Sequence, residues 1–229
     1  MVKMGFVVDL TRCIGCQTCV IACKEENNTP PGVSWIRVLE IDVDDEIYHL
    51  PIMCGHCEDA PCIEGCPMKA VYRDNHGIIR TNYTKCIGRR SCINACPYNA
   101  RFLIVKEAYF DEGEPYRDVK KITEFKRGTS CNCTLCYNRI LKGLDPACVE
   151  ACPTGALIFG DFEDVNSQVS VLVKESRAFR MVIDRAKPRI YYLAPSEDYA
   201  KKIMEVAKRA LQKEEDNDWS LLGLGKYLA

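Results

Sequence analysis

The cysteines constrain this chain more than any other feature of its sequence. Sixteen of the 229 residues are cysteine, and the first four follow a C-x2-C-x2-C-x3-C spacing at Cys13, Cys16, Cys19 and Cys23. A disulfide framework suits short secreted chains, and cysteines this close together cannot all find well-shaped disulfide partners. Zinc ribbons contain paired C-x2-C knuckles without a third and fourth cysteine in the same run. The spacing instead predicts an iron–sulfur cluster held by three local thiols, with the fourth cysteine serving a neighbouring cluster.

Three related groups follow, two with a longer spacer before the third cysteine and one in a damaged form. The second group is Cys54, Cys57, Cys62 and Cys66, and the fourth is Cys133, Cys136, Cys148 and Cys152. The third group contains Cys86, Cys92 and Cys96, with Arg89 at the position of its second cysteine. Arginine stays protonated and has no lone pair to donate, so Arg89 cannot bind iron.

Two residues beside the groups allow more than one role. Cys131 stands outside all four groups and is interpreted as a buried free thiol, because isolated cysteines behave as small hydrophobic residues. The alternative is that Cys131 completes the damaged third group. His56 lies between Cys54 and Cys57 and is expected to donate a hydrogen bond near a cluster rather than to bind iron.

Secondary-structure patterns surround the cysteine groups. Strands are predicted at 5–10, 35–41, 46–52, 68–73, 77–80, 101–105, 154–160 and 189–193, and helices at 164–174 and 196–215. A hairpin between cysteine groups is what a two-cluster ferredoxin unit requires, and four groups suggest two such pairs. We therefore predict an α+β fold of two ferredoxin-like units of the bacterial two-cluster type, with inserted β-hairpins and a C-terminal helical extension.

The composition argues against several other classes of protein. A formal net charge of −1 gives no reason to expect binding to nucleic acid or to an anionic membrane. No apolar run approaches the roughly 20 residues of a membrane-spanning helix, and the N-terminal stretch is too short and too acidic for a signal peptide. No phosphate-binding glycine loop, haem motif or nucleophile–base set is present, so we expect a non-catalytic subunit. The apolar tail at 219–229 is expected either to pack on its own chain or to dock into a partner.

Several stretches around the cysteines match those of a known family; they are residues 8–16, 22–27, 54–62, 95–98, 146–155 and 160–161. On these stretches the chain resembles the four-cluster electron-transfer (beta) subunits of the DMSO reductase superfamily, including those of polysulfide, thiosulfate, tetrathionate and arsenate reductases. The resemblance covers about residues 4–193. It implies that the first group pairs with the fourth and the second with the third. The implied domains are a first unit of residues 1–53 and 130–160, a second unit of 54–100, an insert hairpin at 101–129, and a partner-docking extension at 161–229.

The resemblance also implies four sets of ligands, numbered here as sites 1 to 4. Site 1 takes Cys13, Cys16, Cys19 and Cys152; site 2 takes Cys54, Cys57, Cys62 and Cys96; site 3 takes Cys66, Cys86 and Cys92; site 4 takes Cys133, Cys136, Cys148 and Cys23.

Site 3 is where this chain departs from the family pattern, because Arg89 replaces a cysteine. We expect it to hold a [3Fe-4S] cluster, or a [4Fe-4S] cluster with Cys131 or solvent as the fourth ligand; an empty site is the remaining alternative. Arg89 and Arg90 are expected to favour the reduced, more negative cluster and so to raise its potential. The full complement is three [4Fe-4S] clusters plus this atypical one.

The function implied by the resemblance is electron relay. The partners would be a large molybdenum or tungsten bis-pterin catalytic subunit, nearest site 1, and a quinone-reactive membrane subunit or a soluble carrier. The alternatives are an electron-transfer subunit of a cytoplasmic formate dehydrogenase or hydrogenase complex, and a free polyferredoxin. The expected location is the periplasmic face of the membrane, reached by co-export with a signal-bearing partner, or the cytoplasm.

Overall fold

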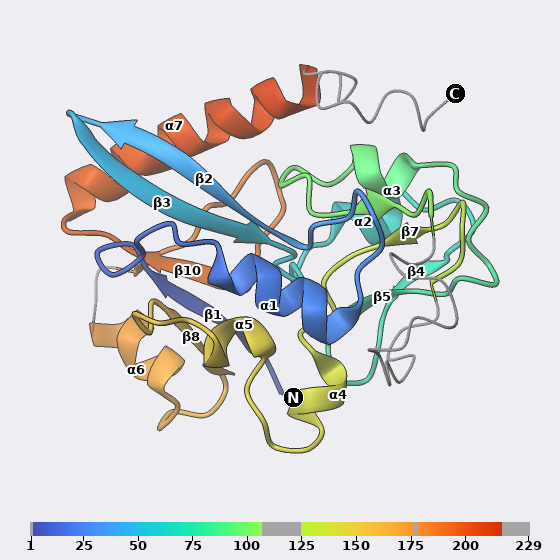
Figure 1. Cartoon of the computed structure of the whole chain (residues 1–229), viewed down its shortest axis with the longest axis horizontal. Helices are drawn as coiled ribbons and strands as arrows, with labels where there is room; N and C mark the ends of the chain where they lie inside the picture. Colours follow the sequence, from blue (N-terminus) through green and yellow to red (C-terminus); the bar gives the residue numbers. More distant parts are fainter. Residues whose placement is uncertain (1, 107–124, 176–177, 217–229) are drawn as a thin grey trace, which may run out of the picture.

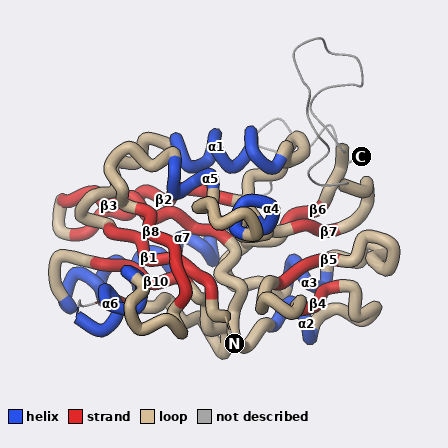
Figure 2. The backbone as a smooth tube through the Cα atoms, turned by 90° about the horizontal axis from the view of Figure 1, so that it is seen from below, coloured by secondary structure: helices blue, strands red, loops and turns tan. Residues whose placement is uncertain are grey.

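The structure is a computed structural model that describes residues 2–106, 125–175 and 178–216. The tail at 219–229 and most of the insert predicted at 101–129 lie outside the described residues. Short helices and strands alternate along the chain in an α+β architecture, as predicted (Figures 1 and 2). No helix within the described ranges is both long enough and apolar enough to cross a membrane.

The first strand, β1 (Met4–Asp9), brings the two ends of the chain together. It pairs antiparallel with β8 (Leu157–Asp161) and parallel with β10 (Ile190–Leu193), and β10 pairs with β9 (Ala178–Phe179). Three consecutive apolar residues of β1 are at most 1% exposed, which suits a central strand covered on both faces. Helix α6 (Gln168–Glu175) packs on β8 and β1 and so covers part of this sheet.

A long hairpin forms a second layer. Its strands, β2 (Ile36–Val43) and β3 (Glu46–Met53), are antiparallel and joined by Asp44 and Asp45 alone. Both aspartates have positive φ, 53° and 65°, as a two-residue type I′ turn requires.

The last described helix, α7 (Glu197–Asp216), packs along β2, as Figure 1 shows. The Ser196 hydroxyl caps its first turn by accepting a hydrogen bond from the Tyr199 backbone N–H at 3.3 Å. Its buried stripe includes Ile203 and Leu211, both at most 1% exposed. The helix predicted from residue 196 to about 215 is therefore confirmed.

Shorter elements hold the cysteine groups. The helices are α1 (Thr18–Asn27), α2 (Pro61–Glu64), α3 (Ser91–Asn94), α4 (Tyr137–Ile140) and α5 (Ala147–Glu150). The strands pair as β4 (Val71–Arg73) with β5 (Ile79–Thr81) and β6 (Phe102–Leu103) with β7 (Ser130–Cys131). α1 packs on α5 and α2 packs on α3, so the first group lies beside the fourth and the second beside the third.

Several predicted elements are shorter in the structure; the strand expected at 68–73, for example, is reduced to β4 (Val71–Arg73). Two others show a physical reason. The strand expected at 101–105 is reduced to Phe102 and Leu103, because β7 offers only two residues as partners. The helix expected from residue 164 begins at Gln168, because Asp164 forms a turn in which its carboxylate accepts a hydrogen bond from the Asn166 N–H at 2.9 Å.

Candidate metal centres

The residues of site 1 come from both ends of the cysteine framework. Cys13 and Cys16 lie in the loop before α1, Cys19 lies in its first turn, and Cys152 follows α5. Burial raises the pKa of Cys19 to about 11, and the other three thiols of the set add to that rise. The structure therefore brings all four cysteines of this set together.

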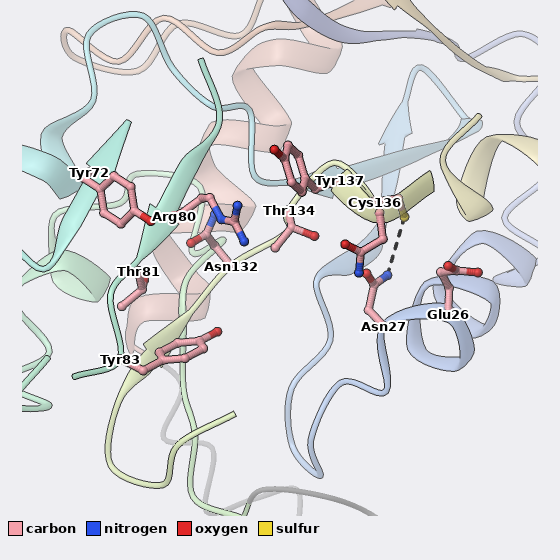
Figure 3. Close-up of a pocket in the computed structure, with 11 residues that line it drawn as sticks. Glu26, Asn27, Tyr72, Arg80, Thr81, Tyr83, Asn132, Thr134, Cys136 and Tyr137 are labelled. Carbon is pink, nitrogen blue, oxygen red and sulfur yellow. Dashed lines mark hydrogen bonds between the residues drawn. The ribbon is translucent and has the colours of Figure 1, made fainter. Parts of the chain in front are cut away.

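Site 4 begins one helical turn further along α1. Burial raises the pKa of Cys148, and Cys23 and Cys136 raise it further; the same two thiols are neighbours of Cys133. The Asn27 amide nitrogen lies 3.6 Å from the sulfurs of both Cys23 and Cys136. Figure 3 shows Asn27 directed at Cys136 on the wall of a cavity of about 260 Å³. One amide thus contacts two thiols of the same set.

Three of the four cysteines of site 2, Cys54, Cys57 and Cys62, are at most 9% exposed. Burial raises the pKa of Cys57, and three neighbouring thiols raise it further; these are Cys54, Cys96 and Cys62. Burial raises the pKa of Cys62 as well, and Cys92 of site 3 is among the thiols that raise it further. Sites 2 and 3 are therefore adjacent at Cys62 and Cys92. All four predicted residues of site 2 are therefore neighbours.

The loop of the second group is held by two arginines from outside it. Arg73 and Arg189 both donate to the backbone carbonyl of His56, at 3.3 and 3.0 Å. The backbone N–H of Arg189 also donates to the Gly55 carbonyl at 2.7 Å. Arg189 directly precedes β10, so a segment far along the chain contacts the loop that carries Cys54 and Cys57. Neither arginine was singled out from the sequence.

The three cysteines of site 3 line one small cavity. Cys66, Cys86 and Cys92 share it with Arg89 and Ser130. The Ala70 N–H donates to the Cys66 sulfur at 3.2 Å, and the Ser130 hydroxyl lies 3.3 Å from the Cys92 sulfur. The three thiols are therefore grouped as predicted, although one cysteine position is occupied by arginine.

Cys131 is directed away from this cavity. Ser130 and Cys131 are consecutive residues of β7, and consecutive side chains of a strand point to opposite faces. Because Ser130 lines site 3, Cys131 lies on the other face, where the Trp35 indole N–H donates to its sulfur at 3.5 Å. Burial raises its pKa to about 11. The contacts of Cys131 are those of a buried thiol packed against tryptophan.

Arg101, which was not anticipated from the sequence, lies between sites 2 and 3. Arg101 is only 3% exposed, and its side chain donates to the Ser130 hydroxyl at 3.2 Å and to the side-chain amide oxygen of Asn132 at 2.9 Å. Arg89 and Arg90, predicted to tune the potential, are exposed. The sequence signal that could have revealed this buried cation is an arginine inside the otherwise apolar run Ala-Arg-Phe-Leu-Ile.

Two buried donors beside these sets lack a protein acceptor within the described ranges. They are Nε of Arg101 and Nε2 of His56. The Ile79 N–H donates to Nδ1 of His56 at 3.0 Å, so the ring proton resides on Nε2. Burial and three nearby arginines hold the pKa of His56 well below its usual value, so it stays neutral. A donor predicted near a cluster is therefore in the right protonation state to bond an inorganic sulfide.

The donor sets fit clusters better than single ions. All sixteen cysteines are free thiols, and no three metal-binding side chains of the described residues converge tightly enough for one ion. Around tetrahedral zinc, with Zn–S bonds of about 2.3 Å, the sulfurs would stand about 3.8 Å apart. Thiols that are grouped but spread out suit a core of several irons, each bound by one cysteine.

Comparisons with known proteins agree with this chemistry. The sequence model of the 4Fe-4S dicluster domain matches residues 45–110 and 104–162. The chain is 39% identical over 211 residues to the iron–sulfur subunit of a putative dimethyl sulfoxide reductase of Halobacterium salinarum, covering 84% of this chain and 79% of that protein. It is 34% identical over 225 residues to the arsenate respiratory reductase iron–sulfur subunit of a Shewanella species, covering 83% and 96%.

A third relative is a tetrathionate reductase subunit of Salmonella typhimurium, 32% identical over 221 residues, with 93% of this chain and 80% of the relative covered. These three relatives belong to the family that the chain was predicted to resemble. The matches cover most of the length of each relative. The chain therefore belongs to the family of 4Fe-4S dicluster proteins that form the iron–sulfur electron-transfer subunits of molybdenum-enzyme reductases.

Proposed function

We propose that this protein carries electrons through four iron–sulfur clusters in the order site 1, site 4, site 2, site 3. Each cluster would accept and release one electron. The observation that carries the proposal is the end-to-end arrangement of the four cysteine sets.

Each neighbouring pair of sets shares a structural link. Cys19 of site 1 and Cys23 of site 4 lie four residues apart on α1, and therefore on one face of the helix. Asn132 links site 4 to site 2, because its amide nitrogen lies 2.8 Å from the Cys133 carbonyl and 3.5 Å from the Cys54 sulfur. Sites 2 and 3 meet where α2 packs on α3. These links support a single path through the protein.

The proposed ligand sets define two ferredoxin-like units. The first unit, residues 1–53 and 130–160, is supported by the pairing of β1 with β8 and of α1 with α5. The second unit, residues 54–100, is supported by the β4–β5 hairpin and by the pairing of α2 with α3. The insert would be residues 101–129 and the docking extension 161–229.

At site 3 we propose a [3Fe-4S] cluster held by Cys66, Cys86 and Cys92. Arg89 has no lone pair for iron, and the contacts of Cys131 lie on the opposite face of β7. With no fourth thiolate at hand, the site favours loss of one iron. The other three sites would each hold [4Fe-4S], through the full cysteine sets given above.

The partner at the site 1 end would be a molybdenum or tungsten bis-pterin catalytic subunit. The names of the relatives, subunits of dimethyl sulfoxide, arsenate and tetrathionate reductases, support such a complex. Exposed apolar residues flank both ends of the path, Ile14 and Ile21 at site 1 and Ile87 and Met68 at site 3. Apolar side chains left exposed in this way suit docking surfaces. The site 3 end would meet a quinone-reactive membrane subunit or a soluble carrier.

Breaking the middle of the path tests its order. The chain is co-expressed with a catalytic subunit of the proposed kind, reduced fully, and mixed with dimethyl sulfoxide, arsenate or tetrathionate while EPR follows each cluster. We expect Cys136→Ser to abolish the cluster at site 4 and to slow reoxidation of sites 2 and 3 at least about tenfold, with site 1 unaffected. Cys131→Ser is the matched control and should behave as wild type. Equal reoxidation rates at all remaining sites in Cys136→Ser would refute the order.

A further inference from the structure

A chain of polar contacts crosses the protein between sites 2 and 3. It starts at the Cys92 sulfur, 3.3 Å from the Ser130 hydroxyl, which accepts a hydrogen bond from Nη2 of Arg101 at 3.2 Å. Nη1 of Arg101 donates to the side-chain oxygen of Asn132 at 2.9 Å, and the side-chain nitrogen of Asn132 lies 3.5 Å from the Cys54 sulfur. One guanidinium is thus two contacts away from a thiol of each site.

The position of Arg101 is costly unless it has an anionic partner. Taking a guanidinium out of water without a counter-charge costs several kcal/mol. Three hydrogen bonds of Arg101 in the described part of the chain go to uncharged acceptors: Ser130, Asn132 and Thr81, whose hydroxyl lies 2.6 Å away. Within the described residues, the groups whose negative charge would act on Arg101 include the thiolates of Cys62, Cys92 and Cys54, which belong to sites 2 and 3. The buried cation is therefore compensated by these two sites together.

We propose that Arg101 raises the reduction potentials of the clusters at sites 2 and 3 together, acting through Ser130 and Asn132. Reduction adds negative charge to a cluster, so a fixed cation and donated hydrogen bonds favour the reduced form. A buried charge is screened much less than an exposed one, so Arg101 acts more strongly than the exposed Arg89 and Arg90. Arg101 is a positioning residue and binds no iron. The inference rests on the proposed placement of clusters at these two sites.

The test is an EPR-monitored redox titration of the purified, cluster-loaded protein. Arg101→Gln should lower the midpoint potentials of both sites 2 and 3, with site 1 unchanged as the internal reference. Ser130→Ala removes only the contact between Arg101 and site 3. It should lower the midpoint potential of site 3 and leave that of site 2 close to the wild-type value. Arg89→Gln is the matched control, because it is the same substitution at an exposed arginine beside site 3. It should shift the midpoint potential of site 3 less than Arg101→Gln does, and it should not shift that of site 2.

The outcomes separate this inference from the proposed function. Iron content and EPR of the wild type come first, because missing clusters at sites 2 or 3 would refute the ligand assignment itself. With all clusters present, unchanged potentials at both sites in Arg101→Gln would overturn the inference alone, as would a shift confined to one site. If Arg101→Gln does not fold, Ser130→Ala still tests the inference. An unchanged midpoint potential at site 3 in that variant would refute the action of Arg101 through Ser130. A purely structural role would lower stability without moving either potential.

Discussion

The loop of the first cysteine group and the loop of the third have the same backbone but different ligands. Gly15 and Gly88 have φ values of 68° and 70°, and the residues just before each helix, Gln17 and Arg90, both have φ of 63°. Arg89 stands where the first loop has Cys16. The conformation of the loop therefore does not depend on the ligand that it presents.

The turns leading into the two loops explain this likeness. The Thr11 hydroxyl donates to the Asp9 carboxylate at 2.6 Å, and the Thr84 hydroxyl donates to the side-chain amide oxygen of Asn82 at 2.7 Å. In each turn a cysteine N–H then donates to the backbone carbonyl four residues earlier, Cys13 to Asp9 and Cys86 to Asn82. Local hydrogen bonds and glycine set the scaffold, and the side chain at one position decides which cluster it can hold.

The largest expected effect comes from giving the third loop the cysteine that the first loop has at the equivalent position. Arg89→Cys supplies the missing thiolate on a backbone already shaped for it, so site 3 should hold [4Fe-4S]. Iron content should rise by about one atom per chain, and the EPR signal of an oxidised [3Fe-4S] cluster should disappear. Arg89→Lys, which keeps the charge without a thiol, should change neither. If Arg89→Cys leaves iron content and signal as in wild type, the two loops are not equivalent.

The second prediction concerns the thiol that the third loop lacks. In protein stripped of clusters, Cys16 is exposed and hydrogen bonding by Thr18 lowers its pKa, whereas burial raises that of Cys19 to about 11. The thiolate is the reactive form, so iodoacetamide at pH 8 should modify Cys16 at least about tenfold faster than Cys19. Both rates should rise with pH, and that of Cys16 should level off at the lower pH. Peptide mass spectrometry gives the rates; equal rates would contradict the difference in environment.

The smallest expected effect is a difference in stability between alanine substitutions at Gly15 and at Gly88. Both have positive φ, so alanine costs about 1–3 kcal/mol at either position. An added Cβ at Gly88 would meet the backbone carbonyl of Gly128, whereas at Gly15 it would meet the side-chain ring of His49, which can move. Gly88→Ala should therefore lower the thermal unfolding midpoint more than Gly15→Ala, as measured by scanning calorimetry. The reverse order would show that the third loop is the looser of the two.

Cysteine spacing predicted much of this molecule because it is a local signal. The motifs before Cys13 and after Cys152 also predicted the strands that became β1 and β8. Grouping of sets from distant segments could be anticipated only through the family resemblance, since spacing alone does not show which groups meet. The Ser196 cap, by contrast, is local and was therefore predictable.

The residues that the sequence did not reveal act across long sequence separations. Arg101 lies 29 residues from Ser130, and Arg189 lies 133 residues from His56, so no local pattern connects them. The direction of Cys131 depended on the register of a two-residue strand, which periodicity cannot supply. Buried polar contacts of this kind follow from the packed fold rather than from any single motif.

The third loop keeps the scaffold of the first, and we propose that it differs in the cluster that it holds. EPR of the oxidised, anaerobically purified wild-type protein, with iron counted on the same sample, tests this most directly. We predict a [3Fe-4S] signal of about one spin per chain, with about 15 iron atoms. Absence of that signal with about 16 iron atoms would show four complete clusters and contradict the proposal.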